Sequence, residues 1–139
     1  MKAVMSVILF VGGLFLFSLF ETRASLGASA GGLTQTQAGG GVTVKVTYLN
    51  PKASDDVRFQ VILDTHSVNL DGYDLKALSV LQDDAGKTYQ PTGVENKGSG
   101  HHREVTVSFP KATPEIKWLE LVIKDIAGAK ERTFRWDQR

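Results

Sequence analysis

Apolar and polar residues alternate with a period of two through much of the chain. The first such run is Val42–Tyr48 (VTVKVTY), where every second residue is apolar and the residues between them are Thr or Lys. This alternation is typical of a β-strand with one buried and one solvated face. The pattern recurs in Val57–Asp64, Arg103–Phe109, Ile116–Asp125 and Arg132–Trp136. These runs constrain the chain to a fold made mainly of β-strands.

Two more strands are expected between these runs. Leu75–Gln82 (LKALSVLQ) is compatible with a strand or with a short helix, because its leucines recur every three residues and Asp74 can cap a helix. We favour a strand, because the turn sequence DDAGK and a second extended segment, TYQPTGVE, follow and would complete a hairpin.

The spacing of these segments predicts a fold class. About seven strands in a domain of about 100 residues resemble an antiparallel β-sandwich of immunoglobulin-like or fibronectin III-like architecture. The Cys…Trp…Cys signature of true immunoglobulin domains is absent from the sequence. The resemblance covers residues 42–139. It implies nothing about activity, because this sandwich carries many unrelated functions.

The N-terminus predicts a hydrophobic helix ahead of the sandwich. After Lys2, the run Ala3–Phe20 carries no charge. The small residues Ala28–Ala30 fit the cleavage site of a signal peptide, whereas a helical run of about 27 Å also fits an uncleaved anchor. Residues 1–25 are therefore a signal peptide or an N-terminal membrane anchor. Either alternative predicts an exported protein that is periplasmic, cell-surface or secreted, and that contacts the membrane only through this segment if it stays uncleaved.

The segment between this helix and the sandwich is poor in apolar side chains. Residues 26–41 (LGASAGGLTQTQAGGG) are mostly Gly, Ala, Thr and Gln. Such a composition buries too little apolar surface to offset the entropy of ordering. We predict a flexible tether over 26–41, with the folded domain beginning at Val42.

Charge and cysteine content limit the classes of partner and of chemistry that the chain can have. The chain carries 16 Lys and Arg against 15 Asp and Glu, so nothing in its net charge predicts nucleic acid as a partner. It has no cysteine, which excludes disulfides, thiolate zinc sites and a cysteine nucleophile.

Polar loops are expected to gather at one end of the sandwich. If successive strands alternate in direction, the loops 65–74, 96–102 and 126–131 emerge at the same end. Two of these loops carry all three histidines of the chain, His66, His101 and His102, and Asp64 and Asp125 lie beside the loops.

Imidazole and carboxylate groups are ligands for copper and zinc. We therefore consider a Cu(II) or Zn(II) site built from His66, one of the adjacent pair His101 and His102, and Asp64. Adjacent residues of a regular strand point to opposite faces, so all three histidines binding together would need a bend in the chain. The alternative is that these histidines are simply solvated or cap turns. The aspartates lack the spacing of a calcium loop.

No catalytic motif is present in the sequence: there is no nucleophile elbow, phosphate-binding loop or HExxH pair. We therefore predict a protein that is not an enzyme. The leading expectation is an exported interaction or accessory domain with a protein partner, and the alternative is a small extracytoplasmic copper- or zinc-binding protein. Most aromatic residues fall in the core phase, and Trp118 is the exception because it is out of phase with Leu119 and Leu121.

Overall fold

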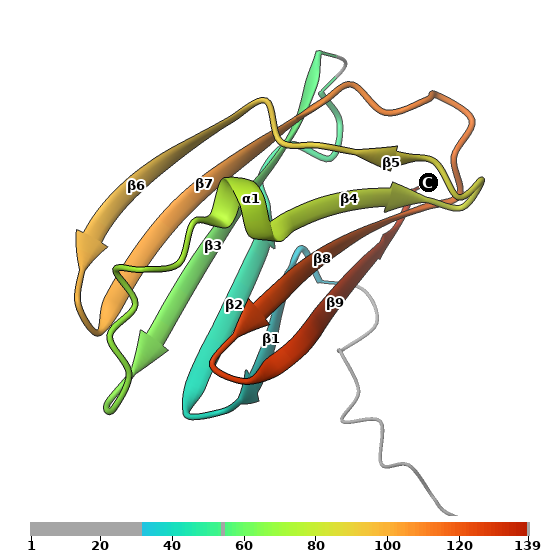
Figure 1. Cartoon of the computed structure of the whole chain (residues 1–139). Coiled ribbons are helices and arrows are strands. Elements are labelled where there is room, and N and C mark those ends of the chain that lie inside the picture. The colour runs from blue at the N-terminus through green and yellow to red at the C-terminus, as the bar shows by residue number, and fades with distance from the viewer. Residues whose placement is uncertain (1–31, 54, 139) are drawn as a thin grey trace, which may run out of the picture.

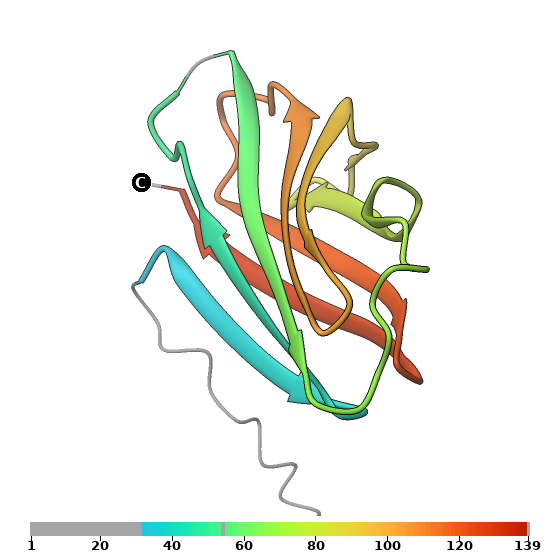
Figure 2. The same cartoon turned by 90° about the vertical axis from the view of Figure 1, so that its left-hand side faces the viewer.

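The computed structural model describes residues 32–53 and 55–138, which form two packed antiparallel sheets (Figures 1 and 2). Sheet A has five strands in the order β1-β2-β3-β7-β6, and sheet B has four in the order β5-β4-β8-β9. The elements are β1 (Thr34–Gly39), β2 (Val42–Tyr48), β3 (Asp56–Thr65), α1 (Leu75–Leu78), β4 (Ser79–Asp83), β5 (Thr88–Tyr89), β6 (Gly93–Ser99), β7 (His102–Pro110), β8 (Trp118–Ile126) and β9 (Ala129–Asp137). The predicted antiparallel β-sandwich is confirmed at this level.

The core lies between the sheets and is filled by the residues that the alternation predicts to point inward. In β3, Phe59, Val61 and Leu63 are fully buried while the residues between them are more exposed. The rings of Tyr48 and Trp136 each lie 4.9 Å from the ring of Phe59, centroid to centroid. Aromatic pairs at this separation add to the free energy gained by burying their area. The two sheets are therefore joined through an aromatic cluster as well as through aliphatic side chains.

The predicted boundary at Val42 is wrong, because a strand precedes it. Thr34–Gly39, part of the predicted tether, forms β1 and pairs antiparallel with β2. The Nε2 groups of Gln35 and Gln37 donate to the backbone carbonyls of Arg135 and Thr133, each at 2.5 Å. Polar side chains thus attach this segment to β9 across the gap between the sheets. Composition missed the strand because its binding depends on hydrogen bonds and not on apolar burial.

The predicted strand over Leu75–Gln82 is only partly correct. Leu75–Leu78 forms the short helix α1, and β4 begins at Ser79. The side chain of Asp74 accepts a hydrogen bond from the Lys76 amide, which is the capping role that the helical alternative required. The helix lets Leu75 enter the core before the chain becomes extended.

The expected number of strands is also too low. TYQPTGVE is divided into β5 and β6, with Pro91 between them. The predicted loop 96–102 is mostly strand, since β6 continues to Ser99 and the turn is confined to Gly100 and His101. The glycine-rich polar sequence resembles a loop because its side chains contribute little to the core.

The predicted N-terminal helix, at 1–25, and the part of the predicted tether at 26–31 lie outside the described residues. In the part of the chain that the structure describes, no helix has the length and apolar character needed to cross a membrane.

Candidate functional site at the loop end

Four connections meet at one end of the sandwich, at the lower left of Figure 1. We call this the loop end: the β1–β2 turn (40–41), the β3–α1 loop (66–74), the β6–β7 turn (100–101) and the β8–β9 turn (127–128). The Leu70 amide donates to the Gly100 carbonyl at 2.9 Å, and the Ala127 amide donates to the Tyr73 hydroxyl at 3.0 Å. The prediction that the three polar loops share one end is confirmed, and a fourth turn joins them.

Arg103 is a buried cation that holds the long β3–α1 loop. Its side chain, only 7% exposed, donates from Nη1 to the carbonyls of Leu70 (2.6 Å) and Tyr73 (2.7 Å). Its Nη2 donates to Oδ1 of Asn96 on β6 at 2.6 Å. A planar guanidinium can satisfy several acceptors at fixed angles, which a lysine cannot do. The loop is thereby fixed to the β6–β7 hairpin.

Arg132 does the same for the turns on the opposite side of the loop end. It is 3% exposed, and it donates to the carbonyls of Ile126 (2.9 Å) and Gly39 (2.6 Å). Burial lowers the pKa of the Arg132 guanidinium from its ordinary value, and the Tyr73 side chain acts in the opposite direction. Tyr73 therefore contacts both sides of the loop end: its carbonyl binds Arg103, and its hydroxyl accepts from the amide of Ala127, the residue after the Ile126 whose carbonyl binds Arg132.

Short polar side chains complete the framework. Thr65 donates from Oγ1 to the Gly41 carbonyl at 2.7 Å and accepts from the amides of Ser67 and Val68, each at 3.2 Å. Asp71 accepts from the Gly100 amide at 2.7 Å. These bonds occupy backbone groups that would otherwise require water, so the loop end has a defined conformation.

Gly40 marks the tightest contact of the loop end. Its φ is +62°, and a Cβ at this position would lie 1.9 Å from the Ala127 carbonyl oxygen. Only glycine fits both the backbone angle and the space. The β1–β2 and β8–β9 turns therefore pack backbone against backbone.

The histidines lie around this framework and are exposed. The Nδ1 atom of His101 lies 3.1 Å from the Val68 carbonyl oxygen. His102 is on the outer face of sheet A, where its Nδ1 contacts the Asp64 carboxylate of the neighbouring strand. The two adjacent histidines thus have different partners, His101 from the β6–β7 turn and His102 from the first residue of β7. His66 lies in the β3–α1 loop.

The structure brings together only part of the predicted metal site. Asp64 contacts His102, and His101 packs on the loop that carries His66. Within residues 32–53 and 55–138, no group of three or more His, Asp or Glu side chains is close enough to hold a metal ion. Asp125, at the edge of the third loop, is exposed with φ +55°. The copper or zinc site remains a prediction.

Sequence reasoning missed the two arginines, although the alternation contains the signal for both. Arg103 has the same phase as the inward residues Val105 and Val107, and Arg132 has the same phase as Phe134. An arginine in the inward phase at the end of a strand indicates a buried cation that binds loop carbonyls. To find such residues from sequence, a polar residue at an inward position of the alternation has to be counted as buried.

A second polar cluster lies in the β4–β5 hairpin. Asp83, 1% exposed, accepts hydrogen bonds from the amides of Ala85 and Lys87, both at 3.0 Å, and from the Tyr89 hydroxyl at 2.8 Å. Burial alone would raise the pKa of Asp83, but these hydrogen bonds outweigh it and hold the pKa below its ordinary value. The carboxylate is fully used in fixing the turn, so it has a structural role.

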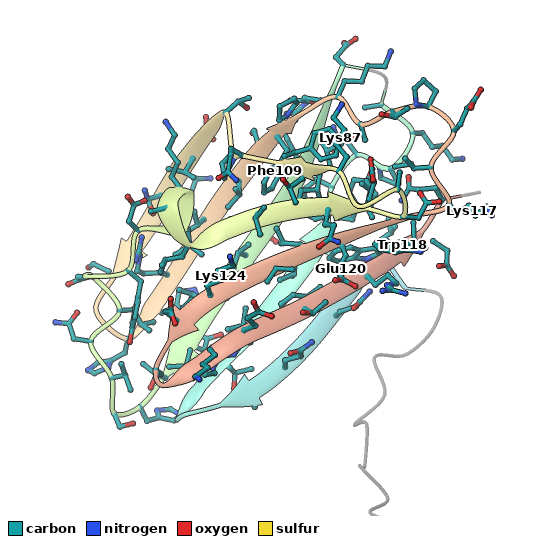
Figure 3. The ribbon with its side chains drawn as sticks, turned by 45° about the vertical axis from the view of Figure 1, so that its right-hand side comes forward. Lys87, Phe109, Lys117, Trp118, Glu120 and Lys124 are labelled. Atoms are coloured by element: carbon teal, nitrogen blue, oxygen red, sulfur yellow. The ribbon has the colours of Figure 1, made fainter. Side chains whose placement is uncertain are left out.

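The outer face of sheet B carries Trp118, Glu120 and Lys124 along β8 (Figure 3). The guanidinium of Arg135 lies 4.0 Å from the centroid of the Trp118 ring and donates two hydrogen bonds to Glu120. Trp118 is half-buried and outside the core, as its phase predicted. The ring is covered by this cation, so it is a poor platform for stacking a ligand.

The class that these observations define is an all-β sandwich with a polar loop end fixed by two buried arginines. Comparison with models of protein families, with curated proteins and with solved structures finds no match to this chain.

Proposed function

We propose that this chain is an exported, non-enzymatic interaction domain of the immunoglobulin-like type, and that its loop end binds a protein partner. One observation carries the proposal: Arg103 and Arg132 are both buried, and both donate to loop carbonyls. Burying a cation without a carboxylate partner costs free energy. Two buried guanidinium groups at the loop end hold its loops in one conformation. A surface that is preorganised in this way loses less entropy on binding, which suits the recognition of a partner.

The strand order supports the immunoglobulin-like part of the proposal. In immunoglobulin constant-type domains, strands A, B, E and D form one sheet and C, F and G form the other. Beginning from β2, the order β2-β3-β7-β6 corresponds to A-B-E-D, and β4-β8-β9 corresponds to C-F-G. In this correspondence β1 is an additional strand at the edge of the first sheet, and β5 is an additional strand at the edge of the second. In variable domains of that class, loops at one end of the sandwich form the binding surface.

Export is supported by the uncharged N-terminal run at residues 3–20. The same segment makes the sandwich either a released domain or one displayed from a membrane.

Site-specific photocrosslinking in the cells that produce the protein tests this proposal. A photoreactive amino acid is placed at His66 or His101, two exposed positions of the loop end, and at Glu115, an exposed position between β7 and β8. We expect a defined adduct with one protein from the loop-end positions and none from the control. Adducts that are absent at both loop-end positions, or equally strong at Glu115, contradict the proposal.

A copper- or zinc-binding protein is the second candidate, and a specific observation favours it. The Nδ1 atoms of His101 and His102 are each engaged by an oxygen, from Val68 and Asp64 respectively. Metal-binding histidines usually have one ring nitrogen held by such an oxygen while the other binds the ion. Calorimetric titration with copper and with zinc tests this candidate. A saturable site that is lost in His66→Ala and His101→Ala supports it, and an affinity unchanged by both substitutions contradicts it.

A further inference from the structure

Strand β6 is an open edge of sheet A. It pairs with β7 on one side only, and residues 95–99 are all exposed. In the described part of the chain, no backbone hydrogen bond joins residues 93–99 to any segment other than β7. An edge of this kind presents a row of unpaired amides and carbonyls, to which another strand can add.

The other sheet edges are protected. β1, the other edge of sheet A, faces β9, an edge of sheet B. Side-chain hydrogen bonds join these two edges, because Gln35 and Gln37 of β1 donate to β9 carbonyls and Arg132 of β9 donates to the Gly39 carbonyl. At the outer edge of sheet B, β5 has only two residues, Thr88 and Tyr89. Covering an edge and shortening it are the usual ways to prevent edge-to-edge pairing. β6 is longer, with seven residues, and among the described residues no strand pairs with its outer side.

The charges on β6 are arranged symmetrically about Asn96. Glu95 and Lys97 flank it, and both point to the outer face of the sheet, because residues two apart share a face. Neither side chain forms an ion pair or side-chain hydrogen bond with another described residue. On β7, Thr106 lies opposite Glu95, and Glu104 lies opposite Lys97 without forming an ion pair with it. The strand therefore carries two charges of opposite sign at its edge, and neither forms an ion pair with a described residue.

We propose that β6 pairs antiparallel with β6 of a second copy of this chain, on a two-fold axis at Asn96. In this register Glu95 of one copy lies opposite Lys97 of the other, and the same contact recurs on the opposite side of the axis. A two-fold interface requires this self-complementarity, in which residue i meets residue j and j meets i. Directly opposed charges of opposite sign stabilise an antiparallel pair.

Neighbouring registers are excluded by the same reasoning. An axis at Glu95 places two glutamates opposite each other, and an axis at Lys97 does the same for two lysines. A shift by a single residue would pair outer-face residues with inner-face residues and break the continuity of the faces. Gly98, with φ +77°, bends the chain and limits regular pairing at that end.

The assembly has a defined shape. Sheet A contributes five strands from each copy, so pairing through β6 gives one continuous sheet across the axis. Because the β6 strands run in opposite directions, the two loop ends lie at opposite ends of the dimer. The interface is small, so we expect association that depends on concentration.

Charge reversal tests the register. The oligomeric state of the purified full chain is measured by sedimentation over a range of concentrations, for the wild type and for Glu95→Lys, Lys97→Glu and the double variant. Each single variant places like charges opposite each other twice, which we expect to weaken dimerisation about tenfold. The double variant exchanges the charges and restores the wild-type association. Lys45→Glu, on the exposed face of β2, is the matched control and leaves association unchanged.

Cysteine pairing tests the contact directly, because the chain has no cysteine of its own. A mixture of Glu95→Cys chains with Lys97→Cys chains is expected to form a disulfide-linked dimer under mild oxidation. Either variant alone places its cysteines diagonally, about 7–8 Å apart between backbones, and links poorly. A wild-type chain that stays monomeric at all concentrations overturns the proposal. So does a dimer whose affinity the single charge reversals leave unchanged, or one that links equally well in each variant alone.

Discussion

Replacing Arg103 by methionine should destabilise the domain and loosen the β3–α1 loop. The substitution removes donors from the carbonyls of Leu70 and Tyr73 and from Oδ1 of Asn96. Leu70 is fully buried, so its carbonyl has no ready access to water. Asn96 is exposed and can be hydrated. The three acceptors therefore contribute unequally to the cost.

The magnitude follows from this inequality. After the substitution the buried Leu70 carbonyl keeps only a longer hydrogen bond, from the Tyr73 amide at 3.3 Å. Losing the Arg103 donor there costs about 1–2 kcal/mol, and each of the other two lost hydrogen bonds costs about 1 kcal/mol. Methionine offsets part of this, because its side chain is apolar and the desolvation of a buried cation is relieved. We expect a net loss of about 3 kcal/mol in the free energy of unfolding. Arg103→Lys keeps the charge but not the planar fork, and should lose about half as much.

Urea denaturation of the full chain measures these free energies, with Arg58→Met as the control. Arg58 is exposed and forms an ion pair with Asp56, so its replacement should cost less than about 1 kcal/mol. Hydrogen exchange supplies a local measurement, because the Leu70 amide is bonded to the Gly100 carbonyl. We expect this amide to lose more protection in Arg103→Met than the global loss of stability explains. Equal costs for the Arg103 and Arg58 substitutions, or unchanged protection at Leu70, would refute the role assigned to Arg103.

Three further predictions concern other parts of the fold. Asp83→Asn should destabilise the protein at neutral pH. Because the pKa of Asp83 is lowered in the folded state, the extra stability of the wild type is present above the unfolded pKa of about 3.9 and is lost as pH falls through the folded pKa. Chemical denaturation of both proteins across this pH range checks the prediction. Gly40→Ala should lower the melting temperature far more than Gly86→Ala: both glycines have positive φ, but an added Cβ meets the Ala127 carbonyl only at position 40. Similar melting temperatures would contradict the contact. Gln37→Ala should cost about 1 kcal/mol by removing the bond to β9, and an unchanged denaturation midpoint would count against it.

Most of the core could be predicted from the alternation alone. Val44, Phe59, Val107 and Phe134 all lie where a period of two places them, because an antiparallel sheet with one wet face leaves no other arrangement for these side chains. The shared loop end also followed from strand direction. These features depend on local periodicity and connectivity, which a single sequence contains.

The features that were missed depend on contacts between distant residues. β1 looks like a tether because Gln35 and Gln37 are polar, yet their partners lie in β9, far along the chain. The α1 helix was weighed against a strand because one turn of helix produces too short a pattern to distinguish them. The predicted metal site is only partly assembled for a similar reason. Strand direction places Asp64 and His66 at the same end of the sandwich, but the register between β3 and β7 places Asp64 beside His102.

Four polar residues in the inward phase have a common role in this sandwich. Thr65, Asp83, Arg103 and Arg132 are all buried, and each lies at or near the end of a strand, where it binds backbone groups of the adjoining turn. The apolar core cannot supply such bonds, so at the ends of the sheets a polar side chain must replace an apolar one if the turns are to be fixed. The loop end has three of these residues. Its exposed histidines are therefore presented by a framework that is separate from them. Substitutions in the two sets should have different effects: loss of stability from the framework, and loss of the proposed binding without loss of stability from the histidines.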